Sequence, residues 1–99
     1  MNGRYILRDK VPVAVDDLML WAMAFEKMDR RVALTVGDNG VRMSTVFLGL
    51  DHSFGFSGGP PLLFETMIFG GEHDEYCDRY STWAEAEVGH EKARKLAGI

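Results

Sequence analysis

The sequence predicts one α+β domain with an antiparallel sheet of three to four strands and two helices packed on one face of that sheet. Three observations lead to this prediction. The chain has 99 residues, too few for two separate hydrophobic cores, so residues 1–99 form a single domain. Apolar runs predict strands at four places, and apolar residues recur with a helical period at two others. The expected order is β-α-β-β-β-α.

The first strand and the first helix are expected near the N-terminus. Residues 4–8 form the β-type run RYILR, and Pro12 followed by Asp16 and Asp17 indicates a turn that leads into a helix. Over residues 17–29 apolar side chains recur at helical spacing: Leu18, Trp21, Ala22, Phe25 and Met28. Three more apolar side chains widen this surface: Met19, Leu20 and Met23. We therefore expect the helix to contact more than one neighbour.

A β-hairpin is predicted in the middle of the chain. Residues 32–36 alternate between apolar and other residues, and residues 41–52 form a second extended run. The Asn39-Gly40 pair between them favours a two-residue turn, because both residue types tolerate positive φ angles. That turn predicts three cross-strand pairs on one face: Val36 with Met43, Leu34 with Thr45, and Val32 with Phe47.

The second half of the chain is expected to hold one more long strand and a helix. Residues 53–61 are rich in Gly and Pro and predict a loop, and residues 62–69 form an apolar strand. Residues 72–78 are acidic and predict an exposed loop. Thr82 and Glu85 have the spacing of a capping box, so a second helix is expected over residues 83–97.

The predicted strands carry bulky apolar side chains on both faces, whereas two helices on one side cover only one. A homodimer is the simplest source of cover for the second face, because a two-fold axis buries the same patch on both subunits. The surplus of six Met, six Phe and two Trp in this short chain points the same way.

Charge argues against several function classes. The net charge is −4, and the second half of the chain, with four basic and nine acidic residues, carries most of it. This balance disfavours an electrostatic grip on nucleic acid or on an anionic membrane. The N-terminus predicts no signal peptide, and no apolar stretch predicts a membrane span. One cysteine, Cys77, cannot form an internal disulfide, so a cytoplasmic setting is expected.

Three sequence words carry a resemblance. They are STVFLGLDH at 44–52, GGPPLLFETMIFGG at 58–71 and YSTWAEAEVGH at 80–90. In these words the chain resembles a family of small uncharacterised proteins encoded by bacteriophages and prophages, over roughly residues 18–92. The resemblance implies a phage or prophage protein that acts inside a bacterial cell. It implies no activity, cofactor or catalytic residue.

Four residues are the candidates for acid–base or metal chemistry: Asp51, His52, Glu65 and His90. Carboxylates and imidazoles together could move protons or bind a metal ion. Their spacing matches no metal-ligand or catalytic signature. The alternative interpretation, in which Asp51 caps a turn and His52 and Glu65 hydrogen-bond loop amides, is favoured. We expect no metal site and no cofactor.

Other polar groups are expected to be structural. His73 stands among acidic residues in a predicted exposed loop, without the spacing of a calcium loop. Cys77 lies next to Asp78, and a nearby carboxylate raises a thiol pKa, so an unreactive thiol is expected. The glycines of the 53–61 loop are followed by Pro60 and Pro61, which lack amide protons, so nucleotide binding is not expected.

The function predicted from these observations is a non-enzymatic interaction or accessory factor that acts as a homo-oligomer. Four apolar residues are the candidates for the interaction: Phe54, Phe56, Met19 and Met23. Its partner would be a second copy or a host or phage protein, and neither nucleic acid nor membrane is expected. The alternative is a small acid–base or metal-dependent enzyme that uses the four candidate residues above.

Overall fold

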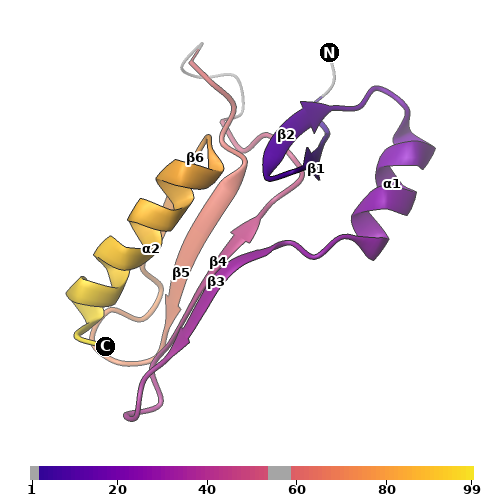
Figure 1. The fold of residues 1–99 in the computed structure, drawn as a ribbon. Coiled ribbons are helices and arrows are strands. Elements are labelled where there is room, and N and C mark those ends of the chain that lie inside the picture. The colour runs from indigo at the N-terminus through magenta and orange to yellow at the C-terminus, as the bar shows by residue number, and fades with distance from the viewer. Residues whose placement is uncertain (1–2, 54–58) are drawn as a thin grey trace.

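The computed structural model describes residues 3–53 and 59–99, and the predicted interaction residues Phe54 and Phe56 lie outside them. It confirms the α+β class with antiparallel sheets. The elements in chain order are β1 (Tyr5–Arg8), β2 (Val11–Ala14), α1 (Leu18–Lys27), β3 (Arg31–Val36), β4 (Arg42–Phe47), β5 (Phe64–Phe69), β6 (Cys77–Tyr80) and α2 (Trp83–Ala97). Strands β3 to β6 form a four-stranded sheet in sequence order, and β1 pairs with β2 in a separate hairpin (Figure 1).

The two helices differ in what they contact. Helix α2 packs along one face of the four-stranded sheet and contacts all four of its strands. Helix α1 contacts β1 instead, and it lies beyond the β1–β2 hairpin, apart from α2 (Figure 1). Of the two helices predicted to pack on one sheet face, α2 does so, and α1 packs on β1 instead. The β1–β2 hairpin provides α1 with a different support.

The β1–β2 hairpin is one of two features that the predicted element order lacks. Asp9 and Lys10 form its two-residue loop, and both have positive φ angles, 49° and 70°. Such a loop matches the twist of the strands, but Asn and Gly are its usual residues, so an Asp-Lys pair gives little sequence signal. The hairpin packs against the core through Tyr5 and Leu7, and the Lys10 ammonium lies 5.4 Å from the centre of the Trp83 ring.

Strand β6 is the other addition. Its first two residues belong to the segment 72–78 that is predicted as a loop, but Cys77–Tyr80 pairs with β5 and forms one edge of the sheet. Three of its four residues are exposed. A polar edge strand has no apolar alternation, so the charge pattern pointed to a loop.

The predicted hairpin of β3 and β4 is present, but the register predicted for it is wrong by one residue. Gly37 and Val41 form the last pair, and three residues, Asp38 to Gly40, make the loop. Gly40 has φ +84°, as the third residue of such loops usually does. Met43 therefore stands opposite Thr35 rather than Val36, and Thr45 opposite Ala33 rather than Leu34. A shift of one residue reverses the faces, so Leu34 and Val36 are exposed.

The predicted start of α1 and both predicted ends of α2 are confirmed, whereas α1 ends at Lys27, before the predicted residue 29. The Asp17 carboxylate caps α1 by accepting hydrogen bonds from the amides of Met19 and Leu20. Thr82 and Glu85 form the predicted capping box, and α2 has the predicted bounds. The C-terminal end of α2 is closed by Gly98 at φ +74°.

The buried core lies between α2 and the sheet in three layers. One end is an apolar cluster of Val41, Met43, Ile68 and Ala93, and the other is a cluster of Phe47, Leu63, Phe64 and Ala86. Between them lie three buried polar residues: Thr45, Thr66 and His90. The core thus occupies one face of the sheet and leaves the other face open.

Candidate interaction surface

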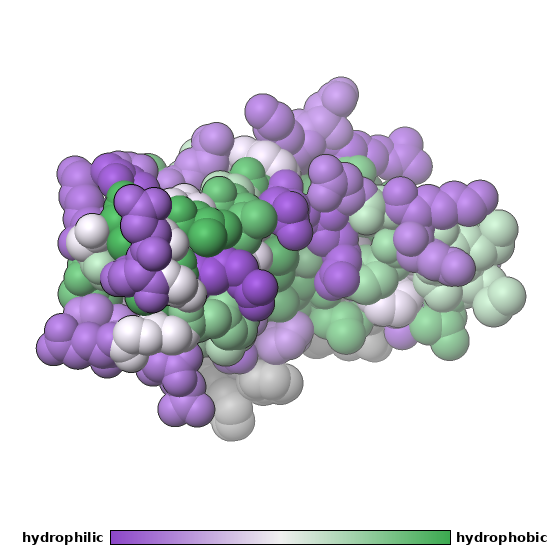
Figure 2. Space-filling model, turned by 90° about the horizontal axis from the view of Figure 1, so that it is seen from below, coloured by the Kyte–Doolittle hydropathy of each residue, from purple (hydrophilic) through white to green (hydrophobic). Residues whose placement is uncertain are grey.

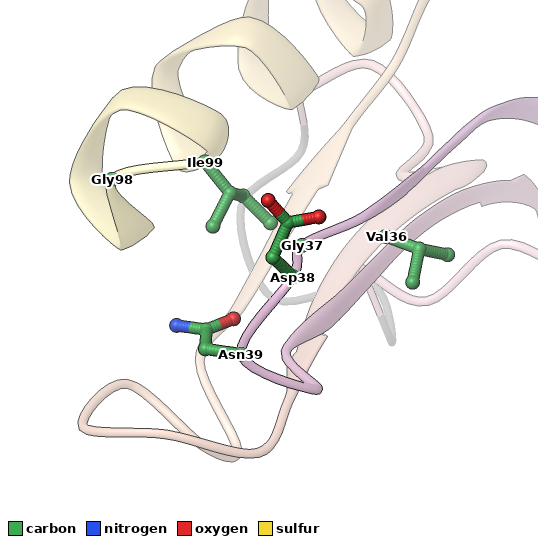
Figure 3. Close-up of a pocket in the computed structure, with 6 residues that line it drawn as sticks. All are labelled: Val36, Gly37, Asp38, Asn39, Gly98 and Ile99. Carbon is green, nitrogen blue, oxygen red and sulfur yellow. The ribbon is translucent and has the colours of Figure 1, made fainter.

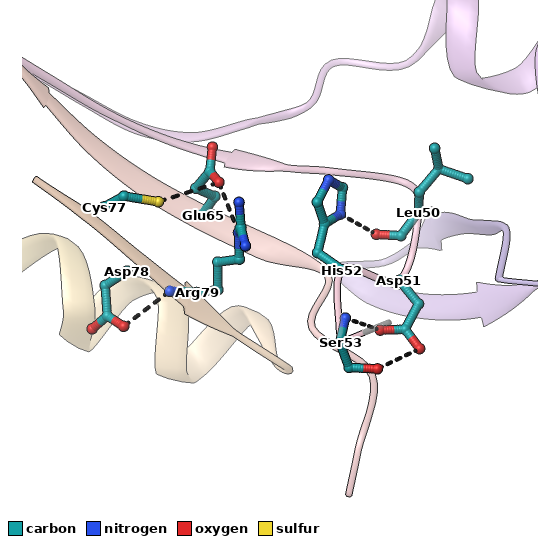
Figure 4. Close-up of polar contacts among 8 residues, drawn as sticks. All are labelled: Leu50, Asp51, His52, Ser53, Glu65, Cys77, Asp78 and Arg79. Atoms are coloured by element: carbon teal, nitrogen blue, oxygen red, sulfur yellow. Dashed lines mark hydrogen bonds and ion pairs between the residues drawn. The ribbon is translucent and has the colours of Figure 1, made fainter. Parts of the chain in front are cut away.

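The four candidate residues for catalysis occupy three separate places. Asp51 holds the start of the loop after β4, where its carboxylate accepts hydrogen bonds from the amides of Ser53 at 2.8 Å and Leu62 at 3.0 Å (Figure 4). Partial burial acts to raise the pKa of Asp51, but these hydrogen bonds outweigh it and hold the pKa below its ordinary value. His52 lies beside it, with Nδ1 2.8 Å from the carbonyl oxygen of Leu50.

Glu65 lies on the open face of the sheet. Its carboxylate accepts a hydrogen bond from Arg79 Nε at 2.9 Å and one from the Cys77 thiol at 3.4 Å (Figure 4). Burial and the Glu65 carboxylate raise the pKa of Cys77, which keeps the thiol protonated and a poor nucleophile. Glu65 therefore takes part in an ion pair on this face.

His90 belongs to α2 and is buried where this helix faces the sheet, on the face opposite to Glu65. Nδ1 is 2.7 Å from the Thr45 hydroxyl and Nε2 is 2.8 Å from the Thr35 hydroxyl. Desolvation lowers the pKa of His90, because the charged imidazolium is disfavoured in the core. Both ring nitrogens are engaged in structural hydrogen bonds, and the ring does not reach the other three candidates.

Groups with metal-ligand chemistry do not cluster. Within residues 3–53 and 59–99, no three His, Cys, Asp or Glu side chains are placed to hold a metal ion. In the loop around His73, the Asp74 carboxylate accepts a hydrogen bond from the Gly70 amide at 2.7 Å, so one of its acids stabilises the turn. Neither helix of the described chain is long and apolar enough to cross a membrane.

A hollow of about 480 Å³ lies between the tip of the β3–β4 hairpin and the end of α2 (Figure 3). Its lining is Val36, Gly37, Asp38, Asn39, Gly98 and Ile99. The Asn39 side-chain oxygen already accepts a hydrogen bond from the Val41 amide, which leaves Asp38 as the ionisable side chain of the lining. One exposed carboxylate without a second acid–base group gives no catalytic pair.

Helix α1 differs from α2 in that none of its ten residues is buried. Its inner side rests on a small contact. Trp21 and Phe25 stack at 5.0 Å, the indole N–H donates to the carbonyl oxygens of Tyr5 and Gly49, and the Phe25 ring lies directly on Gly49. A Cβ atom on Gly49 would lie 2.3 Å from that ring.

The outer side of α1 is apolar and exposed. Four of its side chains are exposed by more than half: Leu18 by 58%, Met19 by 68%, Leu20 by 61% and Met23 by 55%. We call these four residues the α1 patch. In Figure 2 hydrophobic residues gather at the right-hand end of the molecule, which α1 occupies in Figure 1. An exposed apolar cluster of this kind marks a binding surface more often than an inert one.

The open face of the sheet is a mixture of apolar and basic side chains. Leu34, Val36 and Phe69 are exposed there, and the Arg42 guanidinium lies 5.1 Å from the centre of the Phe69 ring. A hollow of about 370 Å³ opens on this face, and its lining is Arg31, Leu34, Arg42, Ser44 and Phe69. The second face thus carries apolar side chains, as predicted, but Leu34 and Val36 are among them because of the register shift, and the sequence pattern did not place arginines there.

Comparisons with protein-family models, with curated proteins and with solved structures find no match for this chain.

Proposed function

We propose that this chain is a non-enzymatic interaction protein and that the α1 patch is its principal binding surface. The observation that carries the proposal is the exposure of Leu18, Met19, Leu20 and Met23 on one helix. Side chains of this size stabilise a fold when they are buried, by about 1.5–3 kcal/mol each. Because these four side chains are exposed, they contribute little to the chain's own core. Burial against a partner explains why large apolar side chains stand at these positions.

The support beneath α1 suits a binding element. The helix is held by Trp21 and Phe25 on one side, and Asp17 caps its first turn. An ordered helix with a free apolar side loses less conformational entropy on binding than a segment that must first fold. Methionine at two of the four positions favours adaptable packing against a partner surface.

The dispersion of the candidate catalytic residues supports the same proposal. Asp51 caps a loop, Glu65 pairs with Arg79, and His90 is bonded to two threonines in the core. No two of these groups face each other across a pocket in the described part of the chain. We therefore retain the interaction role over the acid–base alternative, within the phage or prophage setting that the resemblance implies.

A photo-crosslinking experiment tests this function. A photoreactive amino acid replaces Met19 in the full chain, expressed in the cell that naturally makes it. The matched control carries the same group at Val88, which is 69% exposed on α2. The expected result is a discrete protein adduct from position 19, absent or much weaker from position 88. Equal adducts from both positions, or none from position 19, would overturn the proposal.

A further inference from the structure

The α1 patch and the open sheet face are two unpartnered surfaces of one chain. We propose that the α1 patch of one copy docks onto the open sheet face of a second copy, over the hollow rimmed by Arg31 and Arg42. A two-fold axis repeats the contact, so each copy gives its helix and receives its partner's. This inference rests on the proposed function, because it names the partner of the same α1 patch.

Area is the first argument. The four side chains of the α1 patch expose mainly hydrocarbon, and the open face adds Leu34, Val36 and Phe69. These seven side chains together expose roughly 700 Å², close to the about 800 Å² that each partner contributes to a standard protein interface. A symmetric pair buries both surfaces of both copies at once, whereas an unrelated partner on α1 would leave the sheet face uncovered.

Charge is the second argument. Residues 16–26 contain three carboxylates, Asp16, Asp17 and Glu26, and no basic residue before Lys27. On the open face Glu65 is paired with Arg79, and Arg31 and Arg42 flank the hollow. The charges of α1 itself, Glu26 and Lys27, balance each other, so it is Asp16 and Asp17 at the start of this apolar helix that meet the basic, apolar hollow. Complementary charges of this kind set the orientation of a complex and speed its formation.

The placement of α1 is the third argument. The helix lies at the end of the molecule, beyond the β1–β2 hairpin and apart from α2 (Figure 1). Its inner contacts with Tyr5 and Gly49 direct the α1 patch away from its own β1. Reciprocal docking therefore leaves the α2 side of each copy unchanged.

Sedimentation equilibrium of the purified full chain from 1 to 200 µM tests the pairing. The expected species is twice the monomer mass of 11.1 kDa. M19Q/M23Q is expected to raise the dimer Kd about 30-fold through lost apolar burial. V88Q removes an equally exposed apolar side chain from α2 and is expected to change the Kd less than about twofold. A wild-type chain that is monomeric at 200 µM, or a V88Q effect as large as that of M19Q/M23Q, overturns the pairing.

The basic rim is tested with R31Q/R42Q, matched by K92Q/K95Q on the exposed side of α2. The rim variant is expected to weaken the dimer about tenfold at low salt and to flatten the dependence of Kd on salt, since exposed charges are screened. The matched variant is expected to leave both quantities unchanged. Equal effects of the two variants would show a role for net charge alone and would overturn docking at the hollow.

Mapping of crosslinks separates this inference from the proposed function. A photoreactive group at position 19 of the purified chain is expected to label a peptide of a second copy within residues 31–44 or 64–69. Labels in α2 of the second copy overturn the docking mode. In the cell, adducts from position 19 with a different protein and none with a second copy overturn this inference and leave the proposed function standing.

Discussion

Nδ1 of His90 lies 2.7 Å from Oγ1 of Thr45, at the middle of the interface between α2 and the sheet. The same threonine hydroxyl is hydrogen-bonded to Thr66 on the next strand. His90 therefore joins the helix to three strands, since its other ring nitrogen meets Thr35 on β3. This polar layer separates two apolar clusters. Its hydrogen bonds fix the position of α2 along the sheet, because a helix shifted by one turn would lose them.

Removal of the Thr45 hydroxyl is expected to destabilise the fold. Thr45→Val leaves His90 Nδ1 buried without a partner, which costs about 1–3 kcal/mol in the free energy of unfolding. His90→Leu has a similar cost because the Thr35 hydroxyl loses its partner and the Thr45 hydroxyl loses one of two. The double variant is expected to lose less than the two single losses added together, because both partners are then apolar. Urea denaturation measures all four proteins, and strict additivity would contradict this coupling.

Mild acid is expected to destabilise the protein through His90. Its pKa is lowered by desolvation, while the exposed Glu91 acts to raise it and Arg94 to lower it. As the pH falls below about 6.5, the unfolded chain binds a proton that the folded chain resists, so stability declines and levels off below the lowered pKa. Thermal melts between pH 8 and 5 measure the effect. The decline is expected to shrink in His90→Gln, and an unchanged pH profile would refute the assignment.

Gly89 is expected to tolerate no side chain. A Cβ atom there would lie 2.1 Å from Cζ of the Tyr80 ring, which packs on the helix backbone. Gly89→Ala is expected to cost about 1–3 kcal/mol, although alanine is the better helix former. Tyr80→Leu removes the ring, so the alanine should cost much less in that background. Chemical denaturation of the single and double variants checks this, and an equal cost in both backgrounds would argue against the contact.

Gly49 is expected to control how α1 is held. It has φ +77° and the Phe25 ring lies on it, so Gly49→Ala introduces both strain and a clash. In a Trp83→Phe background, fluorescence reports Trp21 alone. The substitution is expected to move the emission to longer wavelength as the indole leaves its contacts with Tyr5 and Gly49. An unchanged spectrum would mean that α1 does not depend on this contact.

The elements that could be predicted are those with strong local signals. The capping box of Thr82 and Glu85, the cap at Asp17 and the hairpin of β3 and β4 each follow from side-chain chemistry within a few residues. The hairpin register did not follow, because Asn39-Gly40 fits a two-residue and a three-residue loop equally well. The β1–β2 hairpin and β6 carry almost no pattern, since the turn is Asp-Lys and the edge strand is polar.

The surface could be predicted in part. The excess of apolar residues over residues 17–29 predicts a helix that contacts more than one neighbour, whereas in the structure α1 packs on β1 and leaves Met19 and Met23 exposed. The basic rim of Arg31 and Arg42 could not be predicted, because it depends on strand pairing that brings β3, β4 and β5 together. His90 is a candidate catalytic residue in the sequence. In the structure it is buried and hydrogen-bonded to two threonines.

Oxidation of methionine tests the central claim most directly, because it reads the burial of the α1 patch in the unmodified chain. Peroxide converts exposed methionine to the sulfoxide, and mass spectrometry gives a rate for each site. In dilute protein Met19 and Met23 are expected to react quickly, while Met43, which is fully buried, reacts slowly. In concentrated protein or in the cell, Met19 and Met23 are expected to be protected several-fold. An equal rate for Met19 in all three samples would contradict the account.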